Sequence, residues 1–111
     1  MLAPEHKEML TPAEIDTLEL FLSAMKKVAH VKRLYLYGSR STGTANVASD
    51  MDVAVLVNKR EEIRETNHII EHWIETNDFI EGFHPIVVDE EMLANTFFGK
   101  NVKEGKLLWA R

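Results

Sequence analysis

Two apolar segments joined by a short polar one constrain the fold of this chain more than any other feature. The first segment, Val31 to Tyr37, alternates its side chains, and the second, Met51 to Val57, is almost continuously apolar. Alternation indicates a strand with two different faces, whereas a continuous apolar run is typical of a strand buried on both. We therefore expect two strands of one sheet, with other elements packed against it.

Helical periodicity flanks these strands. Thr11-Pro12-Ala13-Glu14 is a helix start in which Thr11 caps the Glu14 amide, Glu14 reaches back, and proline takes the first helical position. Apolar residues then recur at steps of three or four and predict a helix of about 18 residues. They are Ile15, Leu18, Leu22, Met25 and Ala29. A second long helix is predicted over Lys59 to Thr76, where apolar residues recur at the same spacing.

The last part of the chain predicts a third strand, a further helix and a short final strand. Proline at the start of Pro85 to Val88 suits a sheet edge, because proline cannot donate to the strand ladder. Asp89-Glu90-Glu91 is an acidic first helical turn, and Leu107 to Ala110 is the final strand. The order of elements indicates an α/β (α+β) fold, a mixed β-sheet with helices packed on it.

Length and charge restrict the organisation further. A chain of 111 residues supports one hydrophobic core, so we expect a single domain at 11–111. Residues 1–10 have no clear periodicity, and we expect a flexible arm there. Eighteen acidic against thirteen basic residues argue against a broad nucleic-acid-binding surface. The absence of cysteine excludes disulfides and thiolate chemistry. No signal peptide or membrane-length apolar run is present, so we expect a cytoplasmic protein.

Two short motifs whose residue types suit the binding of a phosphate and of a metal ion lie close together in the sequence. Gly38-Ser39 ends the first strand, Asp50-Met51-Asp52 begins the second, and ten residues separate them. Carboxylates two residues apart on a strand face the same side, about 6.5 Å apart, an arrangement that suits Mg²⁺. Gly38 allows a phosphate to approach the backbone, and Ser39 offers a hydroxyl donor. Arg40 is the only charged residue between Gly38 and Asp50.

Each motif by itself is more often a turn or a solvated acid pair. Their adjacency favours function, because two carboxylates on one strand face repel each other unless a cation joins them. No lysine or arginine lies between Ser49 and Asn58 to supply that charge.

The pattern Gly-Ser, ten residues, Asp-x-Asp resembles the signature of the minimal nucleotidyltransferases of the DNA polymerase beta superfamily. The resemblance implies that Asp50 and Asp52 hold two Mg²⁺ ions, while Gly38 and Ser39 bind the phosphates of ATP or another nucleoside triphosphate. It also implies transfer of a nucleoside monophosphate to a hydroxyl acceptor. Related short proteins pair with a helical HEPN-type protein, some as its antitoxin, so such a partner is expected here.

One feature departs from that family pattern. Active members carry a third carboxylate in the next strand, where this chain has Phe83 to Val88 without an acid. Glu81 precedes this strand, and Asp89 follows it as a helix start. Glu81 or His84 is the candidate substitute for the third ligand. The alternative is a catalytically weak or inactive module that binds a nucleotide or a partner protein.

Two further patterns have a structural explanation beside a functional one. His68-Ile69-Ile70-Glu71-His72 fits a zinc motif with both histidines on one helical face, although a solvated helix face explains it better. Trp73 and Phe83 suit a core better than a base-stacking surface. Phe97 and Phe98 cannot both face inward, so one of them is a candidate for a homo-oligomer or partner interface.

Overall fold

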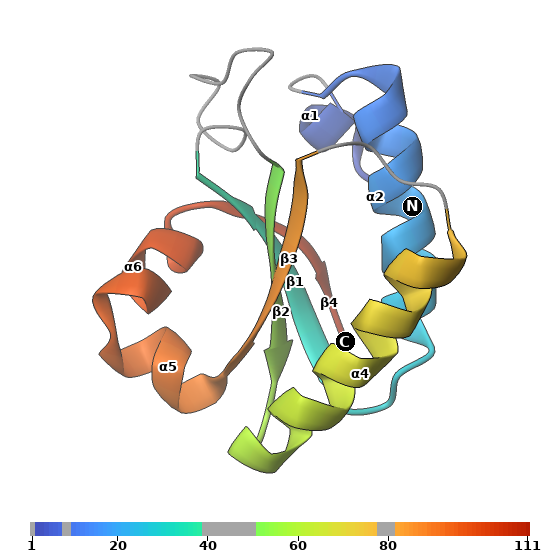
Figure 1. Ribbon diagram of the computed structural model, residues 1–111. Coiled ribbons are helices and arrows are strands. Elements are labelled where there is room, and N and C mark those ends of the chain that lie inside the picture. The colour runs from blue at the N-terminus through green and yellow to red at the C-terminus, as the bar shows by residue number, and fades with distance from the viewer. Residues whose placement is uncertain (1, 8–9, 39–50, 78–81) are drawn as a thin grey trace.

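A four-stranded mixed sheet forms the centre of the protein, with helices on both of its faces (Figure 1). The structure is a computed structural model and describes residues 2–7, 10–38, 51–77 and 82–111. Its elements in chain order are α1 (Pro4–Lys7), α2 (Pro12–Lys26), β1 (Val31–Tyr37), β2 (Met51–Val57), α4 (Arg60–Thr76), β3 (Phe83–Asp89), α5 (Glu90–Asn95), α6 (Phe97–Lys103) and β4 (Lys106–Ala110).

The strand order is β3-β2-β1-β4, in which β1 is antiparallel to β2 and to β4 while β2 is parallel to β3. This topology brings the end of β1 and the starts of β2 and β3 to the same end of the sheet. Asp52 of β2 is the register partner of both Tyr37 on β1 and His84 on β3. The sequence prediction of a mixed sheet is confirmed.

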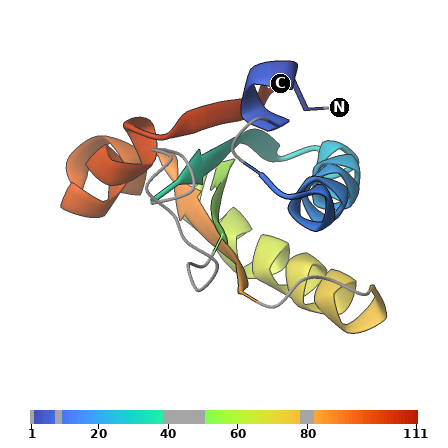
Figure 2. The ribbon, with the colours of Figure 1, turned by 90° about the horizontal axis from the view of Figure 1, so that it is seen from above.

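Both faces of the sheet are covered, by different helices. Helices α2 and α4 pack on one face and α5 and α6 on the other, as the view from above shows (Figure 2). All five residues from Val53 to Val57 have no exposed surface, which confirms the predicted burial of β2 on both faces. Burying a valine or leucine side chain stabilises a fold by about 1.5–3 kcal/mol, so β2 is the centre of the core.

Helix α2 begins where the sequence predicts and ends earlier. The Thr11 hydroxyl accepts from the Glu14 amide at 3.2 Å, and the Thr11 amide donates to the Glu14 carboxylate at 2.8 Å. The helix ends at Lys26, before the expected end near Ala29. Near that end the Arg111 guanidinium donates to the carbonyl oxygens of Lys26 and Val28, both at 3.0 Å, a contact that the local sequence could not predict.

The region after β3 contains two short helices in place of one. Asp89 caps α5 by accepting from the Met92 amide at 2.8 Å, and Thr96 caps α6 by accepting from the Gly99 amide at 2.9 Å. Any Cβ at Gly99 would collide with backbone carbonyl oxygens of α5, so glycine allows the two helices to pack closely. Strand β3 is also longer than predicted, because its ladder with β2 extends over seven residues.

The first residues also include ordered structure. Pro4–Lys7 form α1, Leu2 is only 4% exposed and belongs to the core, and Lys7 lies 3.3 Å from a Glu19 carboxylate oxygen of α2. In the segment expected to be a flexible arm, these described residues pack against the domain. No helix within the described ranges combines the length and apolar character needed to cross a bilayer.

Candidate functional site

Side chains from three strands meet at the end of the sheet where β1 finishes. Val53 and Phe83 belong to the core under α2 and α4. Since side chains alternate along a strand, their neighbours Asp52 and His84 face the opposite side, toward α5 and α6. Tyr37, the register partner of Asp52 on β1, packs against the core cluster on that same side. Three polar side chains therefore share one face at one end of the sheet.

Gly38 lies directly against the Asp52 carboxylate. Its φ angle is +74°, a left-handed conformation that favours glycine, and a Cβ at this position would lie 2.8 Å from Asp52 Oδ2. Glycine is thus required for the backbone turn and also for the space that the carboxylate occupies. The contact joins the first predicted motif to the second.

Tyr37 lies between the Asp52 carboxylate and helix α6. Its ring meets the Phe98 ring edge to face, with centroids 5.5 Å apart and an interplanar angle of 87°. Burial, and to a lesser extent the negative charge of Asp52, together raise the pKa of Tyr37 to about 12. The phenol stays neutral at physiological pH and retains its proton beside the carboxylate.

His84 is exposed and is the β3 residue directly opposite Asp52. Just before β3, Gly82 adopts a φ of +86°, and its carbonyl accepts from the Met51 amide at 2.8 Å. This hydrogen bond joins the start of β2 to the segment that leads into β3. The structure therefore brings one of the two candidate third ligands, His84, next to Asp52.

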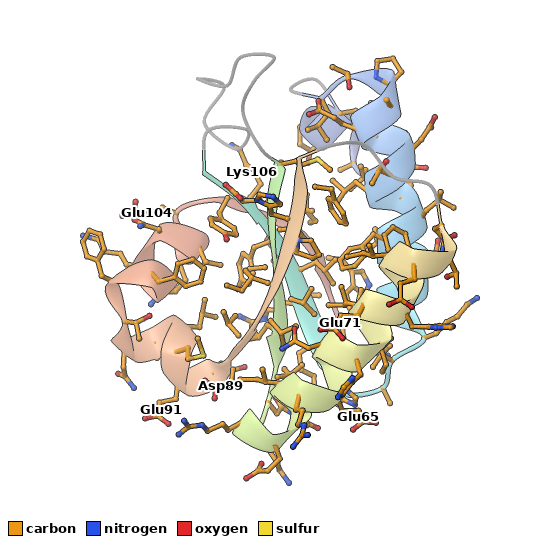
Figure 3. The ribbon with its side chains drawn as sticks, viewed as in Figure 1. Glu65, Glu71, Asp89, Glu91, Glu104 and Lys106 are labelled. Atoms are coloured by element: carbon orange, nitrogen blue, oxygen red, sulfur yellow. The ribbon has the colours of Figure 1, made fainter. Side chains whose placement is uncertain are left out.

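The acid of β3 is at the other end of the sheet. Asp89 pairs with Val57, at the end of β2. Lys106 pairs with Leu36, next to Tyr37, and so marks the end of the sheet that carries the site. Figure 3 shows Asp89 far from Lys106. Asp89 is 5% exposed and caps α5, as the sequence predicts for a helix start. Among the described residues of β3, no carboxylate is in register with Asp52 or next to its partner.

Four candidate residues lie outside the described residues, namely Ser39, Arg40, Asp50 and Glu81. Of the predicted site residues, the structure brings together Gly38, Asp52 and His84. Sequence reasoning missed Tyr37 and Phe98 as neighbours of this site. The position of Tyr37 just before Gly38 was an available signal, whereas no local pattern connects Phe98 to a strand about sixty residues earlier.

The donor set fits a cation that is only partly coordinated by protein. Asp52 supplies carboxylate oxygens, and Mg²⁺ commonly takes one or two carboxylates with waters and substrate phosphates. Within the described part of the chain, no three His, Cys, Asp or Glu side chains gather as metal ligands. A cation at Asp52 therefore needs ligands from a nucleotide or from other residues.

The histidines of α4 form a separate surface feature. His68 Nδ1 lies 3.8 Å from a Glu71 carboxylate oxygen, and both side chains are 70% exposed. His72 is exposed on the same helix. The His-x-x-Glu-His pattern thus lies on a solvated helix face, the interpretation that the sequence favours.

Comparisons with known proteins identify the family and the fold of the chain. The family described as Nucleotidyltransferase domain matches residues 15–108. Protein adenylyltransferase MntA from Aphanizomenon flos-aquae (strain 2012/KM1/D3) is 44% identical over 45 residues, which cover 40% of this chain and 30% of that relative. The match spans less than a third of the relative's length.

A solved structure supports the fold. The crystal structure of a protein from Sulfolobus solfataricus, described as a nucleotidyltransferase, aligns with a TM-score of 0.60 over 98% of this chain and 90% of that one. The sequence identity is 22%, so this likeness concerns the fold alone. Because the family match covers most of the chain, including both motifs, strands β1 to β3 and the first part of β4, the chain belongs to the nucleotidyltransferase domain family.

Proposed function

We propose that this domain transfers a nucleoside monophosphate, AMP from Mg-ATP, to a hydroxyl acceptor. The observation that carries the proposal is the contact between Gly38 and the Asp52 carboxylate. It joins a turn that a phosphate can approach to a carboxylate that can hold a cation. In the reaction, the acceptor oxygen forms a bond to the α-phosphorus. The bond between the α-phosphorus and the oxygen that bridges it to the β-phosphate breaks. Pyrophosphate leaves with that electron pair.

The residues have distinct roles in this proposal. Asp50 and Asp52 hold the two Mg²⁺ ions, and Gly38 and Ser39 bind the terminal phosphates, with Arg40 as a further phosphate contact. When bound, paired cations stabilise the attacking and leaving oxygens of an in-line displacement. The protein's own task is then mainly to position the reactants and to balance charge.

The proton of the acceptor hydroxyl needs a destination. His84 is exposed and directly opposite Asp52, so it can accept this proton or bind the cation. Glu81, three residues earlier, is the second candidate for a third ligand.

The acceptor that we propose is a hydroxyl group on a partner protein. The printed name of the cyanobacterial relative, a protein adenylyltransferase, supports a protein acceptor. We further propose that this partner is a HEPN-type helical protein and that the domain acts as its antitoxin in the cytoplasm. The exposed Phe97, with 79% of its surface accessible, is a candidate contact for that partner or for a second copy of this chain.

A specific observation also supports a second candidate function. The described β3 residues next to Asp52 include no carboxylate, and His84 is its direct partner. A site that lacks the third acid can bind Mg-nucleotide while transferring slowly or not at all. This alternative is a nucleotide-binding or partner-binding module.

Two measurements test these functions. Calorimetric titration of ATP with and without Mg²⁺ is expected to show metal-dependent binding that the Asp50→Asn/Asp52→Asn variant loses. Radiolabel from α-labelled ATP is expected to appear on a protein in a lysate, or on a purified HEPN-type partner, only with the unaltered domain.

The matched control is Asp16→Asn, which removes an exposed carboxylate on α2, a helix that packs on the opposite face of the sheet from Asp52. It is expected to bind Mg-ATP as the unaltered protein does. Binding without any label transfer would favour the module. Binding that survives in the double variant would contradict the proposed site.

A further inference from the structure

The register partner of Asp52 on β3 is His84, whose imidazole nitrogen can bind a metal ion. Asp52 and His84 are register partners on parallel strands, which lie about 4.8 Å apart in a sheet. Both side chains face the α5 and α6 side, because their neighbours Val53 and Phe83 belong to the opposite core cluster. Asp52 is half-buried and His84 is exposed. One carboxylate and one imidazole therefore lie side by side on the face of the sheet that α5 and α6 cover.

This pair of donors differs chemically from two carboxylates. Mg²⁺ is a hard cation that prefers oxygen ligands, whereas imidazole suits first-row transition cations. For a mixed nitrogen and oxygen site, the affinity rises from Mn²⁺ through Fe²⁺ and Co²⁺. Compared with Asp52 alone, a site with His84 beside Asp52 thus has a higher affinity for these cations and nearly the same affinity for Mg²⁺.

We propose that His84 is a metal ligand beside Asp52 and makes this position selective for a first-row transition cation over Mg²⁺. The inference rests on the proposed function, since it concerns a cation of the same site. To the proposed function it adds that His84 is a metal ligand and that the bound cation is a first-row transition metal. The other cation of the site, held on the triphosphate, remains Mg²⁺.

A second histidine pair provides the competing explanation for any transition-metal binding. His68 and His72 are four residues apart on one face of α4, and such a pair can also bind these cations. They lie on a helix that packs against the opposite face of the sheet from His84. The test must therefore separate these two locations.

The experiment uses the whole chain, purified without a histidine tag and studied without nucleotide. Co²⁺ is titrated while visible absorption reports nitrogen ligation and calorimetry reports affinity, and Mg²⁺ is titrated separately. We expect tighter binding of Co²⁺ than of Mg²⁺. His84→Ala is expected to weaken Co²⁺ binding about tenfold or more, with little change for Mg²⁺.

Two further variants complete the design. His84→Asp is expected to shift the preference toward Mg²⁺, because it replaces the nitrogen donor with oxygen. The matched control His68→Ala/His72→Ala is expected to retain the Co²⁺ spectrum and affinity. If His84→Ala fails to fold, the selectivity of His84→Asp decides the question.

The proposal is overturned if His84→Ala binds Co²⁺ as the unaltered chain does, or if the α4 double variant abolishes binding. It is overturned equally if no cation binds. Failure of the proposed function has a different signature. Co²⁺ binding that depends on His84, without Mg-ATP binding or label transfer, would leave the ligand assignment intact and remove the transferase.

Discussion

At Gly38 the absence of a side chain allows the Gly-Ser motif and the Asp-x-Asp motif to meet. The residue combines a φ of +74° with a carboxylate oxygen 2.8 Å from where its Cβ would be. In Gly38→Ala, the left-handed conformation costs roughly 1–2 kcal/mol. The methyl group must in addition displace the Asp52 carboxylate. We expect weaker Mg-ATP binding in calorimetry and a lower free energy of unfolding in denaturant titration.

The control for this substitution is Gly82→Ala. Gly82 has a similar φ of +86°, so alanine there carries a comparable backbone cost. Comparable destabilisation in both variants, with a greater loss of Mg-ATP binding in Gly38→Ala, is the expected pattern. Equal effects on nucleotide binding would show that backbone strain alone explains the result.

Tyr37 predicts a pH dependence. Its pKa in the folded protein is raised to about 12, first by burial and then by Asp52, against an ordinary value of 10.0. Above pH 10 the unfolded chain releases this proton while the folded chain keeps it. The contribution of Tyr37 to stability is thus complete below pH 10 and is lost as the pH rises toward 12.

Near-ultraviolet absorbance of tyrosinate during a pH titration measures this pKa. A Tyr35→Phe background isolates Tyr37, because the chain has two tyrosines. Asp52→Asn is expected to lower the Tyr37 pKa only in part, since burial is the larger cause. An unchanged pKa in that variant would contradict the electrostatic coupling of the two residues.

At the scale of elements, the start of α2 depends on two reciprocal hydrogen bonds between Thr11 and Glu14. Thr11→Ala removes the hydroxyl that accepts from the helix, and loss of such a cap costs about 1 kcal/mol. Denaturant unfolding followed by circular dichroism measures the change. The control Thr76→Ala alters an exposed threonine whose hydroxyl donates to carbonyls of its own helix and accepts from the side-chain amide of the adjacent Asn77. It should change stability by less than about 0.5 kcal/mol.

The elements also show where local patterns are sufficient. Strands β1 and β2 have the predicted bounds, because their alternation and continuous apolar character are local properties. The single helix expected after Asp89 divides at Thr96, which caps a new helix. That division depends on the close packing of Gly99 against α5, which no periodicity records.

At the scale of the whole molecule, Phe21 joins three elements. It has no exposed surface, and its ring contacts those of Trp73 and Phe83 at centroid distances of 5.2 and 5.1 Å. These rings come from α2, α4 and β3. The predicted core role of Trp73 and Phe83 is confirmed, whereas Phe21 lies outside the stripe that the sequence predicts for its helix.

Phe21→Ala is expected to lower the free energy of unfolding by about 3–5 kcal/mol, because it leaves a cavity where three elements meet. That is a large part of the stability of a small domain, about 5–15 kcal/mol. Tryptophan fluorescence during denaturant unfolding measures the loss. Phe97→Ala is the control, since Phe97 is 79% exposed. Similar losses in both variants would contradict this central role.

The sequence by itself determined the bounds of β1 and β2, the presence of the other strands and of the two long helices, the capped start of α2, and the motif pair around Gly38 and Asp52. These features follow from local periodicity and from spacing along the chain. It also determined the family, because the motifs and their ten-residue separation are sequence properties. The roles of Ser39, Arg40, Asp50 and Glu81 remain predictions, since these residues lie outside the described part of the structure.

Only the tertiary structure decided which residues surround Asp52. The parallel register of β2 with β3 places His84 beside it, and the antiparallel register with β1 places Tyr37 on its other side. Register arises from hydrogen bonds and packing between strands that are far apart in sequence, and a shift of one residue would turn every side chain to the other face. The choice of His84 as the neighbour of Asp52, and the position of Asp89 at the other end of the sheet, therefore required the folded chain.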